Sequence, residues 1–74
     1  MFKKSEMKQV EKYLQKLFKS QTIYVNEGNA KGDDAPAELM VDGQFVGVVY
    51  KNDDEGEISY DLNMTILPDD FEGI

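Results

Sequence analysis

Carboxylates are the side chains of this sequence that could do chemistry, and they gather in three short clusters. The clusters are Asp33-Asp34, Asp53-Asp54-Glu55-Glu57 and Asp69-Asp70-Glu72. Hard cations such as Ca²⁺ are held by several carboxylate and carbonyl oxygens, so a divalent-cation site is one hypothesis for these segments. The EF-hand pattern does not fit, because Gly56 at its sixth position would put Lys51 at the first and Leu62 at the twelfth. We therefore expect solvated turns without metal ligands and keep cation binding as an alternative.

Enzymatic chemistry has little support from the residue types. The sequence has no His and no Cys, and acyl transfer usually needs a nucleophile beside a base that titrates near neutrality. A pair of carboxylates could hydrolyse a glycosidic bond, but 74 residues leave little room for a concave pocket. GNAKGD, residues 28–33, differs from a phosphate loop because its Lys precedes the second Gly and no Ser or Thr follows. We predict no enzymatic activity, no catalytic residues and no cofactor.

The charge distribution bears on the choice of partner. The net charge is −7 and no basic residue is Arg, whereas nucleic-acid-binding proteins concentrate Lys and Arg on phosphates and read bases with Arg. Residues 1–20 carry six Lys against two Glu, hence +4, and residues 21–74 carry two Lys against thirteen acids, hence −11. We predict no nucleic-acid binding. An acidic partner of a basic, nucleic-acid-binding protein is a further alternative.

No segment suggests a membrane or an export signal. No apolar run approaches the roughly 20 residues that span a bilayer. The charged start MFKKSEMK is not followed by the apolar stretch of a signal peptide. We expect a cytoplasmic protein that does not contact a membrane.

Hydrophobic spacing predicts one helix, over about residues 5–19. Apolar residues recur there at three- and four-residue intervals, which is the pattern of an amphipathic helix. They are Met7, Val10, Leu14, Leu17 and Phe18, with Tyr13 at the edge of the stripe. Ser5 is the predicted N-cap, and Glu6 places a negative charge in the first turn, where it complements the helix dipole.

Four strands are predicted to follow, over about residues 22–26, 37–42, 44–51 and 57–67. In the last of them apolar and polar residues alternate strictly, and Asp42-Gly43 forms a two-residue hairpin turn between the second and third. The predicted fold is therefore α+β, an N-terminal amphipathic helix packed on a four-stranded, mostly antiparallel meander sheet. Residues 1–74 form a single domain, in which residues 68–74 are a flexible tail.

The hairpin AELMVDGQFVGVVY, residues 37–50, is apolar on both faces. Residues directly opposite each other across a hairpin share a face, so a turn at Asp42-Gly43 assigns alternate residues to each side. The predicted core face, beneath the helix, collects Ala37, Leu39, Val41, Val46, Val48 and Tyr50, together with the alternate residues Ile58 to Ile66. The opposite face then carries an apolar group of Met40, Phe45 and Val49, with Tyr24 from the first strand.

This apolar group predicts an interaction surface. Exposed apolar patches often bind a partner, and a 74-residue chain without Cys or His lacks the disulfides and imidazole sites that commonly stabilise small domains. We therefore predict a small, non-enzymatic protein-interaction domain that associates as a homodimer. Its contact residues would be Met40, Phe45, Val49 and Tyr24. Alternatively, these side chains are scattered exposed residues, or they are covered by the loop of residues 26–36 or by the C-terminal tail with Phe71.

Four segments are similar to a family of short bacterial proteins known only as a domain of unknown function. They are YLQKLF (Tyr13–Phe18), AELMVDGQFVGVVY (37–50), NDDEGE (52–57) and LNMTILPDDF (Leu62–Phe71). The resemblance covers nearly the whole chain and implies a bacterial cytosolic protein with this order of helix and strands. It implies no activity and no functional residues, because none is assigned to the family.

Overall fold

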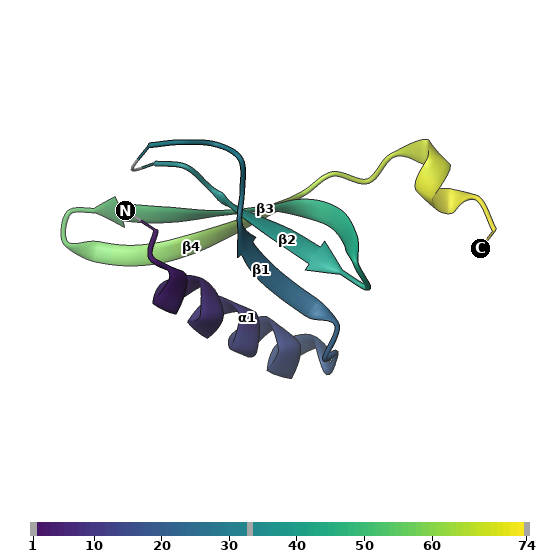
Figure 1. The fold of residues 1–74 in the computed structure, drawn as a ribbon, viewed down its shortest axis with the longest axis horizontal. Helices are drawn as coiled ribbons and strands as arrows, with labels where there is room; N and C mark the ends of the chain where they lie inside the picture. Colours follow the sequence, from purple (N-terminus) through teal and green to yellow (C-terminus); the bar gives the residue numbers. More distant parts are fainter. Residues whose placement is uncertain (1, 33, 74) are drawn as a thin grey trace.

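The computed structural model describes residues 2–32 and 34–73, which form one helix and one four-stranded sheet (Figure 1). The helix is α1 (Lys4–Phe18), and the strands are β1 (Ile23–Glu27), β2 (Ala37–Val41), β3 (Gln44–Asp54) and β4 (Glu57–Met64). The strands lie in the order β1-β2-β3-β4, and each pairs antiparallel with the next. The predicted α+β fold is therefore confirmed. The segment predicted as a tail contains a short 3-10 helix, η1 (Pro68–Phe71).

α1 begins one residue earlier than predicted and is capped by a different side chain. Ser5 lies inside the first turn, so its predicted role as N-cap is wrong. Instead, the Glu6 carboxylate accepts the backbone N–H of Lys3 over 2.9 Å, as the acidic residue of a capping box does. At the other end Lys19 adopts a left-handed φ of 53°, a conformation that ends many helices.

The core lies between α1 and the sheet face that α1 covers. Its buried apolar residues are Phe2, Met7, Leu14, Ile23, Val25, Ala37, Leu39 and Val49. Val25 and Val49 are the most deeply buried, each only 1% exposed. The centre of the core therefore reaches from β1 to β3.

A β-bulge in the hairpin decides which residues of β3 reach this core. Next to the turn, Met40 lies opposite Phe45, as predicted. One step further Leu39 lies opposite Gly47, so Val46 is an extra residue on β3. An extra residue moves every later side chain of its strand to the other face of the sheet.

The bulge makes part of the predicted face assignment wrong. Val49 pairs with Ala37 and is buried beneath α1, whereas the sequence pattern placed it on the opposite face. Val48 and Tyr50, which were predicted in the core, lie on the opposite face, where Tyr50 is 40% exposed. After Val46, the register between β2 and β3 therefore differs by one residue from the predicted register.

α1 also covers the outer edge of β1. The Glu11 carboxylate accepts the backbone N–H of Val25 over 3.0 Å, and the Gln15 amide donates to the Ile23 carbonyl over 2.8 Å. Glu11 and Gln15 are one helical turn apart, so both reach the same strand. They occupy backbone groups that an edge strand otherwise offers to another chain. β4 forms the other edge, and in the described part of the chain no strand lies on its outer side.

Candidate functional site

α1 covers only half of the sheet. A helix with its side chains is about 10 Å wide and neighbouring strands are about 4.8 Å apart, so one helix covers about two of four strands. α1 packs mainly against β1. Val49 of β3 is still buried, but Leu62 and Met64 on the helix-side face of β4 are about half exposed. All eight residues of β4 are exposed.

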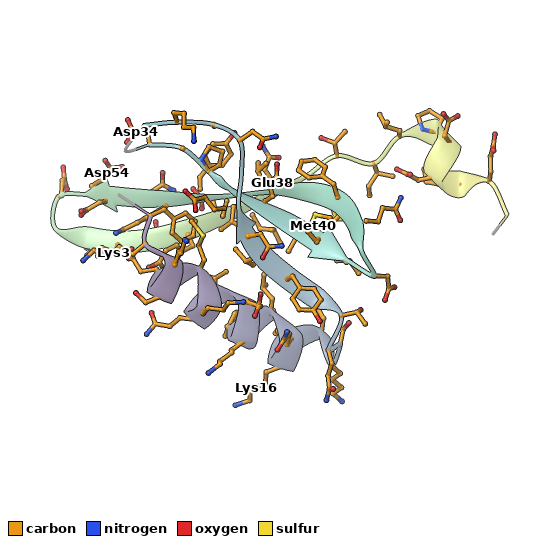
Figure 2. The ribbon with its side chains drawn as sticks, in the orientation of Figure 1. Lys3, Lys16, Asp34, Glu38, Met40 and Asp54 are labelled. Carbon is orange, nitrogen blue, oxygen red and sulfur yellow. The ribbon has the colours of Figure 1, made fainter. Side chains whose placement is uncertain are left out.

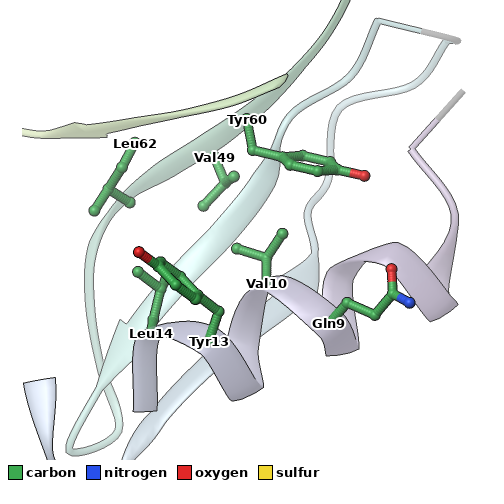
Figure 3. A pocket seen from close by; sticks show the side chains of 7 residues that line it. All are labelled: Gln9, Val10, Tyr13, Leu14, Val49, Tyr60 and Leu62. Carbon is green, nitrogen blue, oxygen red and sulfur yellow. The ribbon is translucent and has the colours of Figure 1, made fainter. Parts of the chain in front are cut away.

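The uncovered area contains an apolar cavity of about 350 Å³ between α1 and the last two strands, here called the groove (Figure 3). Its lining residues are Gln9, Val10, Tyr13 and Leu14 from α1, Val49 from β3, and Tyr60 and Leu62 from β4. Figure 3 shows Val10 and Leu14 facing Val49 and Leu62 across the gap. None of the seven side chains carries a charge at neutral pH, so the groove suits an apolar or aromatic group.

A second hollow, of about 270 Å³, extends the groove toward the C-terminal end of α1. Leu14 and Leu62 line both hollows, and Phe18 and Met64 line the second. Tyr13, Phe18, Leu62 and Met64 are each between 43% and 62% exposed. Single exposed apolar residues are ordinary, but a contiguous group of this kind marks an interaction site.

A polar cluster closes the other end of the groove and ties α1 to the sheet. The Lys51 ammonium lies 2.8 Å from a Glu6 carboxylate oxygen, and the Tyr60 hydroxyl donates to the same carboxylate over 2.9 Å. The Lys51 ammonium, the Lys3 backbone N–H and the Tyr60 hydroxyl together lower the pKa of Glu6 from 4.5 to about 2. The same contact with Glu6 raises the pKa of Lys51. Burial and the hydrogen bond to Glu6 raise the pKa of Tyr60.

The lowered pKa of Glu6 predicts a loss of stability in acid. A carboxylate whose pKa falls on folding stabilises the protein above its unfolded pKa, and this contribution disappears as the pH falls through the folded pKa. We expect wild type to melt at a higher temperature than Glu6→Gln above about pH 5, with the difference closing toward pH 2. Thermal unfolding of both proteins across this range, at one protein concentration, measures the difference. A difference that stays constant down to pH 2 would contradict the assignment.

The predicted contact residues are only partly brought together. Tyr24, Met40 and Phe45 form one row across β1, β2 and β3 on the face away from α1, where Tyr24 and Phe45 are about half exposed. Val49 is not among them, because it lies in the core and lines the groove. The tail leaves Phe45 54% exposed, although Ile66 and Phe71 of the tail line one hollow together with Phe45.

The groove itself was missed by the sequence reasoning. The alternate apolar residues of β4 were expected beneath the helix, and the register does place Leu62 opposite the buried Val49. Leu62 and Met64 nevertheless remain about half exposed, because α1 contacts β4 at its N-terminal end, through Glu6 and Tyr60, and does not cover the rest of the strand. The width of a helix, compared with the spacing of four strands, could have predicted the groove, because a single helix cannot cover four strands.

The acidic clusters form no metal centre in the part of the chain that the structure describes. Within residues 2–32 and 34–73, no group of three or more carboxylates is placed to hold a cation. Asp53 and Asp54 end β3 and Glu57 begins β4, so this cluster surrounds a hairpin turn. Asp33, from the first cluster, lies outside the described residues.

Comparison with known proteins identifies a family for most of the chain. The sequence model of a family described as "Protein of unknown function (DUF3126)" matches residues 6–70. No curated protein and no solved structure matches the chain. No helix in the described ranges combines the length and the apolar composition that crossing a membrane requires.

Proposed function

The chain belongs to the DUF3126 family of proteins of unknown function, and we propose that it is a small, non-enzymatic protein-interaction domain that forms a homodimer through the groove. The observation that carries this proposal is the uncovered half of the sheet. Leu62 and Met64 of this half face the same side as the buried core, yet they are 43% and 52% exposed. A sheet with one apolar face needs a second layer that buries this face. A partner would complete this layer where α1 does not extend.

The surface area supports a second copy as the occupant. The chain exposes 5943 Å² at a mass of 8.4 kDa, whereas a folded monomer of this mass is expected to expose about 4,600 Å². The excess is about 1,300 Å² and exceeds the roughly 800 Å² that each partner buries in a standard interface. The segment after β4 contributes part of the excess and the open groove another part. A dimer could therefore bury a standard interface from surface that a typical monomer of this size does not expose.

The charge pattern permits self-association despite the net charge of −7. The groove is lined by uncharged side chains, and the charged pair at its end, Glu6 and Lys51, is neutral as a unit. Two copies that meet at this surface therefore bring no like charges together among the lining residues of the groove. Like charges would otherwise cost several kcal/mol at an interface.

The test compares one substitution in the groove with one on the opposite face. We expect wild type to be a dimer at high micromolar concentration and Leu62→Lys to raise the dimer dissociation constant by roughly 30-fold or more, as loss of an interface hot spot does. Phe45→Lys should leave the dimer intact, because Phe45 lies on the face away from α1. Light scattering after gel filtration measures the masses, and circular dichroism checks that both variants fold.

The control also distinguishes the two candidate surfaces. Leu62 and Phe45 are both exposed, at 43% and 54%, so Lys at either position should be tolerated by the monomer. Dissociation by Phe45→Lys alone would assign the interface to the row of Tyr24, Met40 and Phe45. A wild type that is monomeric at high micromolar concentration would overturn the homodimer.

Two alternative functions, divalent-cation binding and binding to a basic, nucleic-acid-binding protein, have no comparable observation in their favour. The carboxylates of the described residues are not gathered for a cation, and the case for a basic partner protein rests on net charge alone. Calorimetric titration with calcium and magnesium would test the first, and a salt-sensitive pull-down of a nucleic-acid-binding protein the second. We keep the bacterial cytoplasm as the proposed setting, an expectation that rests on the family resemblance described above.

A further inference from the structure

We propose that the groove of each copy is filled by the C-terminal arm of the other copy, where the arm is residues 65–73. This inference rests on the proposed homodimer and specifies how the two copies associate. It would make the association a reciprocal exchange of arms about a two-fold axis, in which the same two surfaces are used twice.

The arm presents apolar side chains that its own chain leaves uncovered. It leaves the sheet after β4 and extends beyond the end of the sheet in Figure 1. Ile66, Leu67 and Phe71 are each between 57% and 61% exposed. Three such residues within six positions give the arm the apolar groups that the groove can accommodate.

The arm is also held in a defined local conformation. The Asp70 carboxylate accepts the backbone N–H of Leu67 over 2.8 Å, and the Asp70 N–H donates to the Leu67 carbonyl over 2.9 Å. Pro68 begins η1, where its fixed φ suits the first turn. A segment that is already ordered loses less conformational entropy on binding.

The position of the arm is compatible with an exchange. Met64 is the last residue of β4 and lines the second hollow of the groove, so the arm begins directly beside its own groove. If two copies meet at the C-terminal ends of their β4 strands, each arm starts next to the groove of the other copy. Short arms suffice in such an arrangement.

Charge complementarity favours the arm as the occupant. Asp69, Asp70 and Glu72 make it acidic, and it would lie along α1, whose exposed side carries lysines. Lys16 follows Tyr13 by three residues, so it borders the groove on the helix surface, and Figure 2 shows it pointing away from the sheet. Acids on the arm would approach these lysines as the apolar side chains enter the groove.

Disulfide trapping provides the test, because the full chain has no Cys of its own. Full-length Phe71→Cys is mixed with an affinity-tagged full-length Tyr13→Cys under mild oxidation. We expect disulfide-linked heterodimers at a yield several times that obtained with tagged Tyr24→Cys, a matched tyrosine on the opposite face. Equal yields would overturn the exchange, and so would a monomeric internal disulfide in the double variant Phe71→Cys/Tyr13→Cys.

A second measurement separates failure of the arm from failure of the dimer. Phe71→Ala should raise the dimer dissociation constant about tenfold or more, and Tyr50→Ala, an exposed aromatic residue on the face away from α1, should change it less than about twofold. If Leu62→Lys dissociates the dimer while Phe71→Ala has no effect and the cross-link is missing, the arm exchange is wrong and the homodimer stands. A monomeric wild type overturns both.

Discussion

A Gly47→Ala variant should lose about 2–3 kcal/mol of its free energy of unfolding, the upper range for overpacking a well-packed site. A Cβ at this position would lie 2.4 Å from the carbonyl oxygen of Asn63 and 3.1 Å from the Cα of Met64. Both atoms belong to the backbone of β4, so no side-chain rotation relieves the overlap. β3 and β4 would have to separate at this point.

Gly28→Ala is the matched control for this substitution. The three atoms nearest to its new Cβ all belong to the side chain of Glu38, the first at 3.1 Å, and a flexible side chain can move aside. We expect urea unfolding to show a much lower midpoint for Gly47→Ala than for wild type, and a midpoint for Gly28→Ala close to that of wild type. Equal midpoints for the two variants would show that β4 shifts without cost.

Gly47→Ala should also weaken the association of two copies. Gly47 pairs with Met64, which lines the second hollow of the groove, and a displaced β4 would move Leu62 and Met64 relative to α1. If the groove is the dimer contact, the variant should dimerise more weakly under conditions in which it is still folded.

Gly47 also shows where sequence reasoning succeeds and where it stops. The helix stripe and the alternation in β4 are local patterns, and they predicted the elements and their order correctly. The turn at Asp42-Gly43 also predicted the first cross-strand pair, Met40 with Phe45. The bulge at Val46 lies next to Gly47, where β4 comes close to β3. It depends on pairing between strands that no local pattern encodes, and it places Val49 in the core.

The groove was unpredictable for a related reason. Alternation in β4 indicates which side faces the core layer, but it does not say how far the helix extends over the sheet. That position is set by Glu11 and Gln15, which hold α1 against the edge of β1. Polar residues on the apolar side of a helix carry no distinct sequence signal, so the uncovered strands became visible only in the structure.

Glu11 is therefore the side chain whose replacement should reveal most about the position of α1. It is 6% exposed, accepts the N–H of Val25, and lies 3.3 Å from the Lys8 ammonium. In Glu11→Leu the side-chain volume is largely kept, but the buried N–H of Val25 loses its partner. An unsatisfied buried donor costs about 1–3 kcal/mol, so we expect a loss of about that size in the free energy of unfolding.

Glu11→Gln is the control, because its amide oxygen can still accept the N–H of Val25. It loses only the charge opposite Lys8, a pair that is solvent-exposed on the lysine side, and such pairs contribute about 0–1 kcal/mol. Urea unfolding should therefore rank wild type and Glu11→Gln close together and Glu11→Leu well below them. Amide hydrogen exchange at Val25 should accelerate in Glu11→Leu alone, because only there is the edge of β1 uncovered. If Glu11→Leu is as stable as wild type and its Val25 amide stays protected, α1 is held over β1 by apolar packing, and the hydrogen bonds to the strand edge do not determine which half of the sheet stays open.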